Sequence, residues 1–538
     1  MRWRAHHYLN RGEDNDRPEE GNFGFKGRSR VLHVEELERF EEDLTRMIEN
    51  IEFRGTRNAL QDKLQHDIAR MNRASSVFVQ ADKTRNLYEV SPEQYSKLLA
   101  NNITKLYQHA DDDDYSNINT EARELAEKMK PGLTDRMDPI AKRNAYVTLK
   151  DHKENFENKL PCRLINSAKS ETGIISKQIL DRINSQLRRT LSTQHCRNSA
   201  EVIQWFQNIK EKERCSFVNF DIVEFYPSIS PTLLDKSLTW ARQLVTITND
   251  EMDIISNARK SPLFSNGETW KKKNGQGLFD VTRGSFDGTE ICELVGMFAL
   301  ATLPCRYRNS NIGLYRDDGL GVFLGLSGSE AERVRKEITA HFNNLGLKIT
   351  ISCNLRSVNF LDLTLRLDTG KHYPYRKPND TPLYIHCQSN HPPTIIKSLP
   401  AAISRRLTDT SSDEDVFRSA TPIYNDALRA SRNTEQVMYA SERKAPRKRE
   451  KQRQRERNIT WYNPPYNMDV KTKIGKRFLQ LINQHFPPGS KLRKIFNPNT
   501  VKLSYSCRPN VAAIIKRHNT RVCNPEPKRD LPEKHCNC

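Results

Sequence analysis

Two carboxylate motifs, each placed where an apolar run ends, constrain this chain more than any other feature of its sequence. The first is Asp221, which follows the apolar run FVNF. The second is the pair Asp317 and Asp318, which lies in a tight turn between the apolar runs IGL and LGVF. Runs of this length and composition are typical of buried β-strands. Acids at the ends of buried strands are costly unless cations balance their charge, so the chain is expected to bring these strands together around cations.

The residue types at these two places suit divalent cations. Carboxylate oxygens are hard ligands of the kind that Mg²⁺ prefers. If the two strands are neighbours in one sheet, Asp221 and Asp317 can hold two Mg²⁺ ions about 3.5–4 Å apart, with Mn²⁺ as the alternative ion. Asp318 then supplies an additional acid at the same place. A lone Asp-Asp pair is not specific, because Asp also favours turns through hydrogen bonds to its own backbone.

Length and charge narrow the class of protein. A chain of 538 residues is too long for one ordinary hydrophobic core, so several compact domains are expected. Lys and Arg total 87 against 67 Asp and Glu, and the net charge of +20 favours a polyanionic partner, either nucleic acid or an acidic membrane surface. The sequence has no apolar run of about 18 residues and no secretory signal at its start, which favours nucleic acid, no membrane partner and an intracellular location. Eleven cysteines, most of them scattered singly, fit reduced thiols better than a disulfide framework.

Hydrophobic periodicity predicts alternating helices and strands, the pattern of a mixed α/β core. Residues 34–70 are expected to be helical, and the acidic run 111–114 is expected to be a solvated loop. Residues 443–457 are nearly all charged, which leaves open a solvated helix face, a linker or a phosphate-binding segment. Strands are predicted at residues 216–222, 312–326 (two strands around a turn), 348–352 and 359–367, a β-hairpin at 145–166, and helices at 176–191, 231–245, 288–303 and 330–345.

Both acid motifs also resemble the palm motifs of reverse transcriptases. In that family an apolar strand ends in Asp and is followed by an aromatic pair, as in residues 221–229 (DIVEFYPSI). Residues 315–318 (YRDD) are similar to the second palm motif. By this resemblance the ring of Tyr226 lies under the sugar of the incoming nucleotide and excludes a 2′-hydroxyl, so that dNTPs are the expected substrates. Ordinary core packing is the alternative role for Tyr226.

An ordered set of further motifs resembles the Penelope-like retroelement reverse transcriptases. The set covers the chain from about residue 34 to the C-terminus. The resemblance implies an α+β right-hand polymerase fold with fingers, palm and thumb, preceded by a helical N-terminal region. It also implies an RNA-directed DNA polymerase that uses an RNA template, a DNA primer, dNTPs and two Mg²⁺ ions. The motifs are ADKT (81–84), LKDHK (149–153), RLIN (163–166), DGTEICELVG (287–296), FLDL (360–363), SNHP (389–392), WYNPP (461–465) and SYSC (504–507).

The resemblance assigns roles to individual residues. The implied catalytic acids are Asp221, Asp317 and Asp318, with Asp221 and Asp317 as the metal ligands. The implied nucleotide-binding residues are Lys150, Lys153, Arg163, Tyr226 and Lys348, whose side chains suit contacts to phosphate or sugar. The implied template- or primer-binding residues are Gly284, Ser285, Gly288, Phe360 and Leu361. Plainer alternatives are a generic charged hairpin for the fingers cations, an exposed strand lysine for Lys348, a helix start capped by Asp287 for the glycine loop, and core packing for Phe360.

The implied domain order is a partly disordered N-terminal helical region (1–75), fingers (76–200), a palm with both acid motifs (201–376), a thumb with a basic connection (377–500) and a C-terminal tail (501–538). Many members of the family continue through a Cys/His linker into a GIY-YIG endonuclease. Residues 535–538 (HCNC) resemble only the beginning of that linker. Their ligand spacing is incomplete, so no zinc is expected there. Natural absence and truncation of the endonuclease both remain open, and a separate endonuclease is one candidate partner.

Three functional hypotheses follow. The first is an RNA-directed DNA polymerase that extends a primer 3′ end in the nucleus. The second is a catalytically inactive nucleic-acid-binding remnant of such an element. The third is telomerase-like synthesis at chromosome ends without an internal RNA, which differs from the first in its substrate and not in its chemistry.

Overall fold

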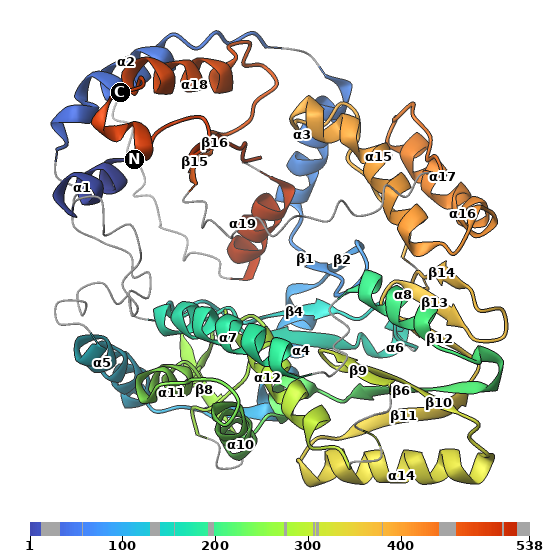
Figure 1. The fold of residues 1–538 in the computed structure, drawn as a ribbon. Helices are drawn as coiled ribbons and strands as arrows, with labels where there is room; N and C mark the ends of the chain where they lie inside the picture. Colours follow the sequence, from blue (N-terminus) through green and yellow to red (C-terminus); the bar gives the residue numbers. More distant parts are fainter. Residues whose placement is uncertain are drawn as a thin grey trace, which may run out of the picture.

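The computed structural model shows helices and strands arranged around a central antiparallel sheet (Figure 1). The structure describes residues 1–11, 33–55, 58–129, 140–154, 156–191, 198–273, 277–304, 307, 311–378, 380–440, 459–507 and 510–523. No helix among these residues is long and apolar enough to cross a membrane.

The central sheet has the strand order β11-β6-β10-β9, and every neighbouring pair is antiparallel. Strand β10 pairs directly with β6, so the prediction that the two acid-bearing strands are neighbours is confirmed. The register places Asp318 opposite Asp221. The strands are β6 (Cys215–Ile222), β9 (Asn311–Tyr315), β10 (Asp318–Leu324) and β11 (Ile349–Leu355).

One face of this sheet is covered by helices. Side chains alternate along a strand, and Val218, Phe220 and Ile222 of β6 therefore point to the same face, where they join the largest buried cluster. Within that cluster α12 is buried along most of its length, and α14 packs on β11 (Figure 1). The helices on this side are α7 (Glu171–Thr190), α10 (Pro231–Arg242), α11 (Asn249–Asn257), α12 (Gly288–Ala301) and α14 (Gly328–Asn344).

The other face of the sheet carries a second core. Phe217 of β6 and Leu320 of β10 pack there against α8 and a small sheet of order β12-β13-β14. The short helix η4 leads into β6 from this side. The elements are α8 (Ser199–Asn208), η4 (Lys212–Arg214), β12 (Ser357–Phe360), β13 (Leu363–Arg366) and β14 (His372–Pro374).

Residues 77–165, within the range expected to be fingers, form paired strands and helices, and residues 263–272, from the range expected to be palm, join them through the pairing of β8 with β3. The pairs β1-β2 and β4-β5 are joined, because the amide of Asp82 donates to the carbonyl oxygen of Leu149 over 2.7 Å. A third small sheet has the order β3-β8-β7. The elements are β1 (Val77–Gln80), β2 (Leu87–Val90), α4 (Pro92–Leu106), β3 (Tyr107–His109), α5 (Asp112–Met129), β4 (Tyr146–Leu149), α6 (Phe156–Lys159), β5 (Cys162–Ile165), β7 (Leu263–Ser265) and β8 (Glu268–Lys272).

Segments from the two ends of the chain pack together in one core, which we call the terminal module. Its centre is aromatic, with the ring of Phe40 lying 6.3 Å from Phe478 and 5.4 Å from Phe486 between centroids. Figure 1 shows α2 beside α18. The elements are α1 (Arg2–Arg11), η2 (Glu35–Leu37), α2 (Glu38–Glu49), β15 (Thr460–Tyr462), α18 (Ile474–His485), η5 (Lys491–Lys494) and β16 (Val501–Leu503).

Two further groups of helices complete the described structure. A helical group follows β14 and has its own small core around Leu407, Phe417 and Leu428. Helices α3 and α19 pack on one another, and α19 also packs on β1. The sequence did not predict α19. The helices are α15 (Pro393–Thr410), α16 (Glu414–Ala420), α17 (Pro422–Ala430), α3 (Ala59–Arg73) and α19 (Val511–Cys523).

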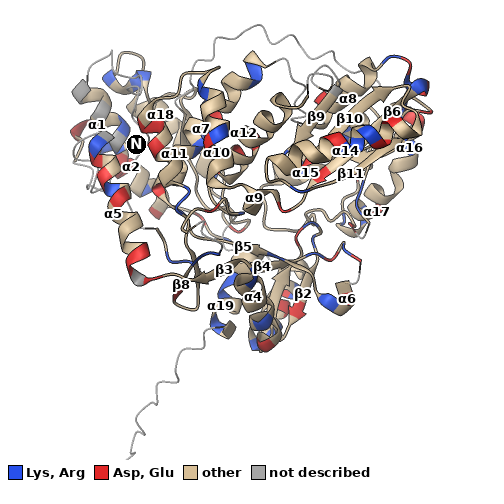
Figure 2. Ribbon diagram, turned by 90° about the horizontal axis from the view of Figure 1, so that it is seen from below, with Lys and Arg blue, Asp and Glu red and all other residues tan. Residues whose placement is uncertain are grey.

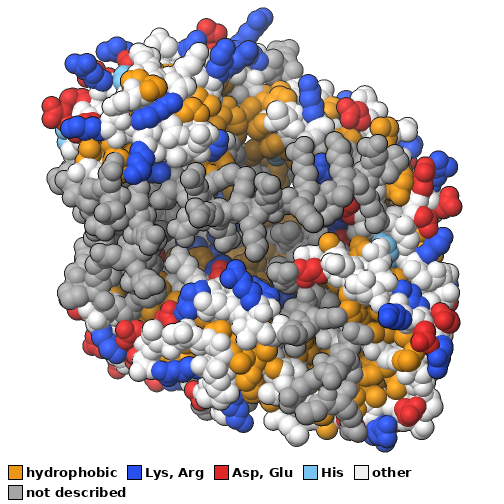
Figure 3. All heavy atoms as spheres, in the orientation of Figure 1, with side chains coloured by type: hydrophobic (Ala, Val, Ile, Leu, Met, Phe, Trp, Pro, Cys, Tyr) orange, Lys and Arg blue, Asp and Glu red, His pale blue; other side chains and the backbone are white. Residues whose placement is uncertain are grey.

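Together these parts confirm the α+β right-hand fold expected from the sequence, with a central palm sheet, hairpins on one side of it and helices after the palm. Three expectations concern residues outside the described parts: the order of residues 12–32, the basic run 443–457 and the HCNC motif. Both signs of charge occur along α14 in Figure 2, and basic, acidic and apolar side chains are interspersed on the face drawn in Figure 3.

The structure corrects two local predictions. The strand predicted at residues 359–367 is interrupted by a turn at Leu361, which separates β12 from β13. Residues 112–114 begin helix α5 and are not a loop. Acidic side chains are favourable in the first turn of a helix, where the backbone carries partial positive charge. Lys271 of β8 adds to this effect, because its ammonium lies 2.9 Å from the carboxylate of Asp114 and 3.2 Å from that of Asp111.

We expect Phe478→Ala to open the terminal module while the palm stays folded. The Phe478 side chain is fully buried, and its removal would leave a cavity that costs about 3–5 kcal/mol. Hydrogen exchange should accelerate in α2 and α18 and stay unchanged in β6 and β10. Ile48→Ala on α2 is the matched control, because Ile48 is 50% exposed and its truncation should cost less than about 0.5 kcal/mol. Unchanged exchange in α18 of the Phe478 variant would contradict the assigned core.

Candidate active site

The sheet register brings the three acids named from the sequence to one end of the palm. Asp221 lies near the end of β6, and Asp318 is the first residue of β10 directly opposite. Asp317 stands in the turn between β9 and β10, where Arg316 adopts a left-handed backbone with φ of 57°. The turn is fixed to β6, because the amide of Ile222 donates to the carbonyl oxygen of Asp317 over 2.8 Å. The three carboxylates therefore occupy one corner of the sheet.

Electrostatics in this corner favour the entry of a cation. Surrounding protein removes water from Asp221, and with the nearby charge of Asp317 this raises the pKa of Asp221. The same two causes, burial first and then Asp317 and Asp221, raise the pKa of Asp318 to about 6. Both side chains still keep access to solvent. Like charges that raise one another's pKa are relieved by a positive ion, so the corner has the properties of a metal site.

The donor set fits Mg²⁺ in a particular way. Among the described residues, no group of three or more His, Cys, Asp and Glu side chains is gathered closely enough to form a complete metal site. Mg²⁺ is usually held by one or two carboxylates and completes its shell with water and substrate phosphates. Asp221 and Asp317 would supply that pair of carboxylates. The residues therefore fit an ion that is shared between the protein and a phosphorylated substrate.

Tyr226 lies next to the acids on the short helix α9 (Phe225–Ser228). The chain turns into this helix at Glu224, whose φ of 49° is left-handed. The Tyr226 hydroxyl lies 3.3 Å from the hydroxyl of Thr289 on α12. Its ring carbon would stand 3.3 Å from any Cβ at position 288. The ring is thus held in place on one side by α12.

The loop before α12 is built for close backbone contact. Gly284 has φ of 118°, and a Cβ there would stand 2.1 Å from the carbonyl oxygen of Asn166. A Cβ at Gly288 would stand 2.7 Å from the hydroxyl oxygen of Ser285. The backbone amide of Asn166 donates to the carbonyl oxygen of Arg283 over 3.2 Å, and this hydrogen bond joins the loop to the end of β5. Both glycines are required by the loop itself, whether or not nucleic acid binds.

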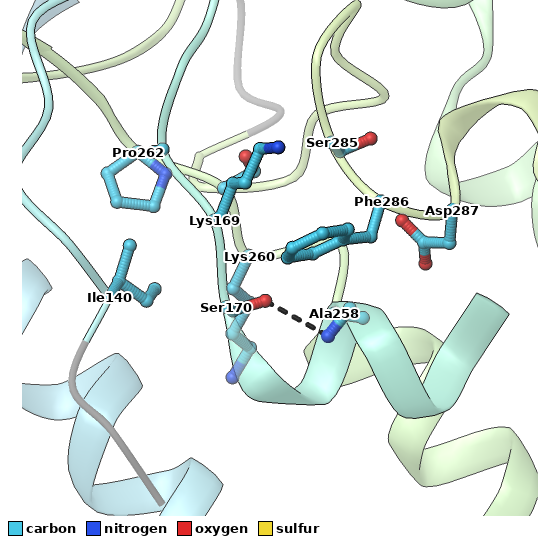
Figure 4. A pocket seen from close by; sticks show the side chains of 12 residues that line it. Ile140, Lys169, Ser170, Ala258, Lys260, Pro262, Ser285, Phe286 and Asp287 are labelled. Carbon is cyan, nitrogen blue, oxygen red and sulfur yellow. Dashed lines mark hydrogen bonds between the residues drawn. The ribbon is translucent and has the colours of Figure 1, made fainter. Parts of the chain in front are cut away.

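Asp287 does not cap helix α12 as the sequence alternative proposed. Its carboxylate makes no cap hydrogen bond, and it accepts hydrogen bonds from Ser176 of α7 and from Arg259. Arg259 is 1% exposed and Asp287 is fully buried, so this buried ion pair stabilises the loop before α12. A small pocket lies beside it, where the Lys169 ammonium stands 4.6 Å from the ring centre of Phe286 (Figure 4).

The three cations named in the fingers have different surroundings. Lys153 is exposed, and its charge favours the ionised form of Asp221 and so opposes the rise in the pKa of that acid. Burial, followed by the charges of Arg163 and Arg283, lowers the pKa of Lys150. Arg163 donates to the carboxylate of Asp82 over 2.6 Å. Asp82 precedes Lys83 in the ADKT motif, which gives that motif a structural role.

The remaining residues named from the sequence lie at the start of β11 and in the β12-β13 hairpin. Lys348 precedes β11 and its side chain is exposed; its carbonyl oxygen accepts from the amide of Val223 over 2.8 Å. Phe360 is 2% exposed and packs in the second core, as the plainer alternative proposed. Leu361 forms the tip of the β12-β13 hairpin, with φ of 56°. Asp362 joins that tip to α15 through Arg406, over 3.1 Å.

Three cations near the acids were missed by the analysis of the sequence. The charges of Lys83 and Lys377 both oppose the rise in the pKa of Asp318. Burial and the neighbouring Lys83 lower the pKa of Lys377 to about 8. Arg283 pairs with Asp317 at 3.7 Å. Lys83 lies within the ADKT motif, Arg283 directly precedes the glycine loop, and Lys377 was noticed only as a domain boundary, so sequence position alone did not indicate their convergence.

Comparison with known proteins gives similarity at the level of solved structures. No protein-family model and no curated protein matches the chain. The telomerase of Candida albicans, solved in complex with a TWJ fragment of telomeric RNA, is 11% identical, with 68% of this chain and 65% of that chain covered at a TM-score of 0.46. The apo telomerase of Candida tropicalis truncated from its C-terminal domain is 13% identical, with 55% of this chain and 63% of that chain covered at a TM-score of 0.38. The RNA-dependent RNA polymerase of a human picorbirnavirus is 11% identical, with 76% of this chain and 89% of that chain covered at a TM-score of 0.37.

The chain spans about two thirds of the length of the Candida albicans telomerase that it matches. With identities of 11–13% and TM-scores of 0.37–0.46, these similarities carry no argument about the activity of this chain.

We expect Asp318→Asn to stabilise the metal-free protein at pH 7.5 and to leave its stability unchanged near pH 4. The folded-state pKa of about 6 lies above the ordinary value of 3.8, so the charged form costs stability above pH 6. This cost disappears as the pH falls through 6 toward 3.8, because the folded protein then takes up the proton. After allowance for solvent exposure the gain at pH 7.5 is roughly 1 kcal/mol.

Urea unfolding in the presence of a chelator measures this difference. Asp235→Asn on α10 is the matched control, since it removes an exposed carboxylate that is not among the main causes of the raised pKa of Asp221 or Asp318. A stabilisation by Asp318→Asn that is equal at pH 4 and pH 7.5 would show that charge repulsion is not its cause.

Proposed function

We propose that this chain is an RNA-directed DNA polymerase of the Penelope-like kind, which extends a DNA primer on an RNA template. The observation that carries the proposal is the pairing of β6 with β10, which sets Asp318 opposite Asp221 with Asp317 in the adjoining turn. Paired carboxylates at the end of a sheet and open to solvent suit metal-assisted transfer of a nucleotide. The motifs named in the sequence support the reverse-transcriptase type.

In the proposed reaction the primer 3′-hydroxyl attacks the α-phosphorus of a dNTP. The bond from that phosphorus to the bridging oxygen breaks, pyrophosphate leaves, and the hydroxyl proton passes to water. Mg²⁺ held by Asp221 and Asp317 would lower the pKa of the hydroxyl and neutralise charge on the phosphates. Positioning and charge neutralisation would supply most of the rate enhancement.

The other residues of the site have roles that follow from their chemistry. Lys150, Lys153 and Arg163 would face the triphosphate, where ammonium and guanidinium groups make charge-assisted hydrogen bonds. Lys348 would act near the leaving pyrophosphate. Tyr226 would support the sugar, because its ring is held by α12 beside the acids. Arg163 also donates to the carboxylate of Asp82 over 2.6 Å, which orients its guanidinium.

The proposed partners are an RNA template, a DNA primer and dNTPs. The net charge of +20 would supply sequence-independent affinity for the backbone of the duplex. The helices after β14 would serve as the thumb. We further propose that the protein acts in the nucleus, where its substrate would lie.

Primer extension on an RNA template with dNTPs and Mg²⁺ tests this function. The parent should extend the primer, and Asp221→Asn and Asp317→Asn should each reduce the rate at least about 10²-fold while duplex binding stays unchanged. Asp235→Asn is the control and should retain the parental rate. Duplex binding without extension by the parent would favour the inactive binding remnant. Extension confined to single-stranded chromosome-end DNA would favour the telomerase-like alternative.

The choice of sugar gives a separate prediction. Tyr226→Ala should raise the incorporation of ribonucleotides relative to deoxyribonucleotides about tenfold or more, because the ring that excludes the 2′-hydroxyl is gone. Tyr226→Phe is the control, since it keeps the ring and removes only the hydroxyl beside Thr289. Single-nucleotide extension with paired dNTP and rNTP measures the ratio. Unchanged discrimination by the alanine variant would assign Tyr226 to core packing.

A further inference from the structure

Arg283 stands between the acid corner and Tyr226. Its backbone is fixed, because its carbonyl oxygen accepts from the amide of Asn166. Its guanidinium lies 3.7 Å from the carboxylate of Asp317 and 5.1 Å from the ring centre of Tyr226. The side chain is 23% exposed. One residue thus contacts a proposed metal ligand and the proposed sugar support at once.

The contact with Asp317 places Arg283 in competition with a metal ion. Among the described residues, Arg283 makes the only ion pair with any of the three acids. Arginine keeps its charge at every relevant pH, so it cannot give up Asp317 by losing a proton. A divalent ion that binds the carboxylate of Asp317 therefore competes with the charge of the guanidinium, which lies 3.7 Å from one carboxylate oxygen.

A second set of cations shows where the displaced guanidinium has a use. Lys150 of the loop after β4, Arg163 of β5 and Arg283 come from three separate segments and lie close enough to repel one another. Arg283 contributes to the lowered pKa of both Lys150 and Arg163, after the effect of burial. Asp82 balances part of this charge through its bond to Arg163. An anion with several phosphate groups would balance the rest.

We propose that Arg283 is the resident cation of the metal-free site, and that metal binding moves its guanidinium from Asp317 to the triphosphate of the incoming nucleotide. This inference rests on the proposed polymerase function and goes beyond it, because it couples metal entry to nucleotide binding through one side chain. The flat face of Tyr226 holds the guanidinium between the two positions by a cation–π contact. The anchored backbone keeps the side chain within reach of both.

The first arm of the test measures metal binding without any reaction. Mn²⁺ is titrated into the full chain, free of nucleic acid, and the unbound ion is counted by electron paramagnetic resonance. Arg283→Gln should bind Mn²⁺ about fivefold more tightly than the parent, because no charge competes for Asp317. Arg283→Lys should resemble the parent. Arg316→Gln is the matched control, because it removes the same charge from the neighbouring turn. The guanidinium of Arg316 lies over the ring of Tyr315 and pairs with none of the three acids.

The second arm measures nucleotide binding. With a primer–template bound and Ca²⁺ present in place of Mg²⁺ to prevent extension, Arg283→Gln should bind the complementary dNTP about tenfold more weakly than the parent. Arg283→Lys should recover most of the loss. The two arms therefore move in opposite directions in one variant, which a purely structural role for Arg283 would not produce.

Each outcome decides a distinct point. Mn²⁺ binding by Arg283→Gln that equals or falls below the parental value would overturn the resident-cation proposal. An unchanged dNTP affinity would overturn the transfer of the guanidinium to the triphosphate. If Asp317→Asn binds Mn²⁺ as the parent does, the metal site itself is wrong, and the proposed function fails together with the inference. If the Mn²⁺ affinity falls in Asp317→Asn but is unchanged in Arg283→Gln, the inference alone is overturned.

Discussion

The antiparallel pairing of β6 with β10 is the constraint on which the rest of the candidate active site depends. It places Asp318 opposite Asp221 and leaves Asp317 in the adjoining turn, so three like charges meet at one end of the sheet. Packing on both faces holds them there. The ring of Phe220 fills the place that a side chain at Gly319 would take, and Leu320 is buried on the opposite side. The hydrophobic cores therefore support an arrangement that electrostatics alone would oppose.

The cations near these three acids come from distant parts of the chain. Lys83 lies in the turn between β1 and β2, Lys153 follows β4, Arg283 precedes α12, and Lys377 follows β14. Some of these cations also crowd one another, as Lys83 does with Lys377. A ligand that carries both metal ions and phosphates would relieve the repulsion among the acids and among the cations together.

Helix α19, the last described helix, is hydrogen-bonded to strand β1 and to the residue that precedes it. Asn519 of α19 bonds to both backbone groups of Phe78, accepting from its amide over 2.9 Å and donating to its carbonyl oxygen over 2.7 Å. The ring of His518 meets the carbonyl oxygen of Ser76 at 2.9 Å. Helix α19 therefore supports β1, which leads to the turn that carries Lys83. Residues near the C-terminus help to fix a cation beside acids in the middle of the chain.

The sequence by itself determined the elements of the palm and the identity of its acids, because period-two burial and the strand-end position of Asp221 are local properties that need no knowledge of the fold. It also left the correct alternative open for Phe360. Tertiary structure alone decided which cations face the acids, that Asp287 binds Arg259 and does not cap α12, that residues 112–114 begin a helix beside Lys271, and that α2 packs on α18. These features depend on contacts between residues far apart in the chain, and sequence spacing carries no information about such distances until the sheet and its cores have formed.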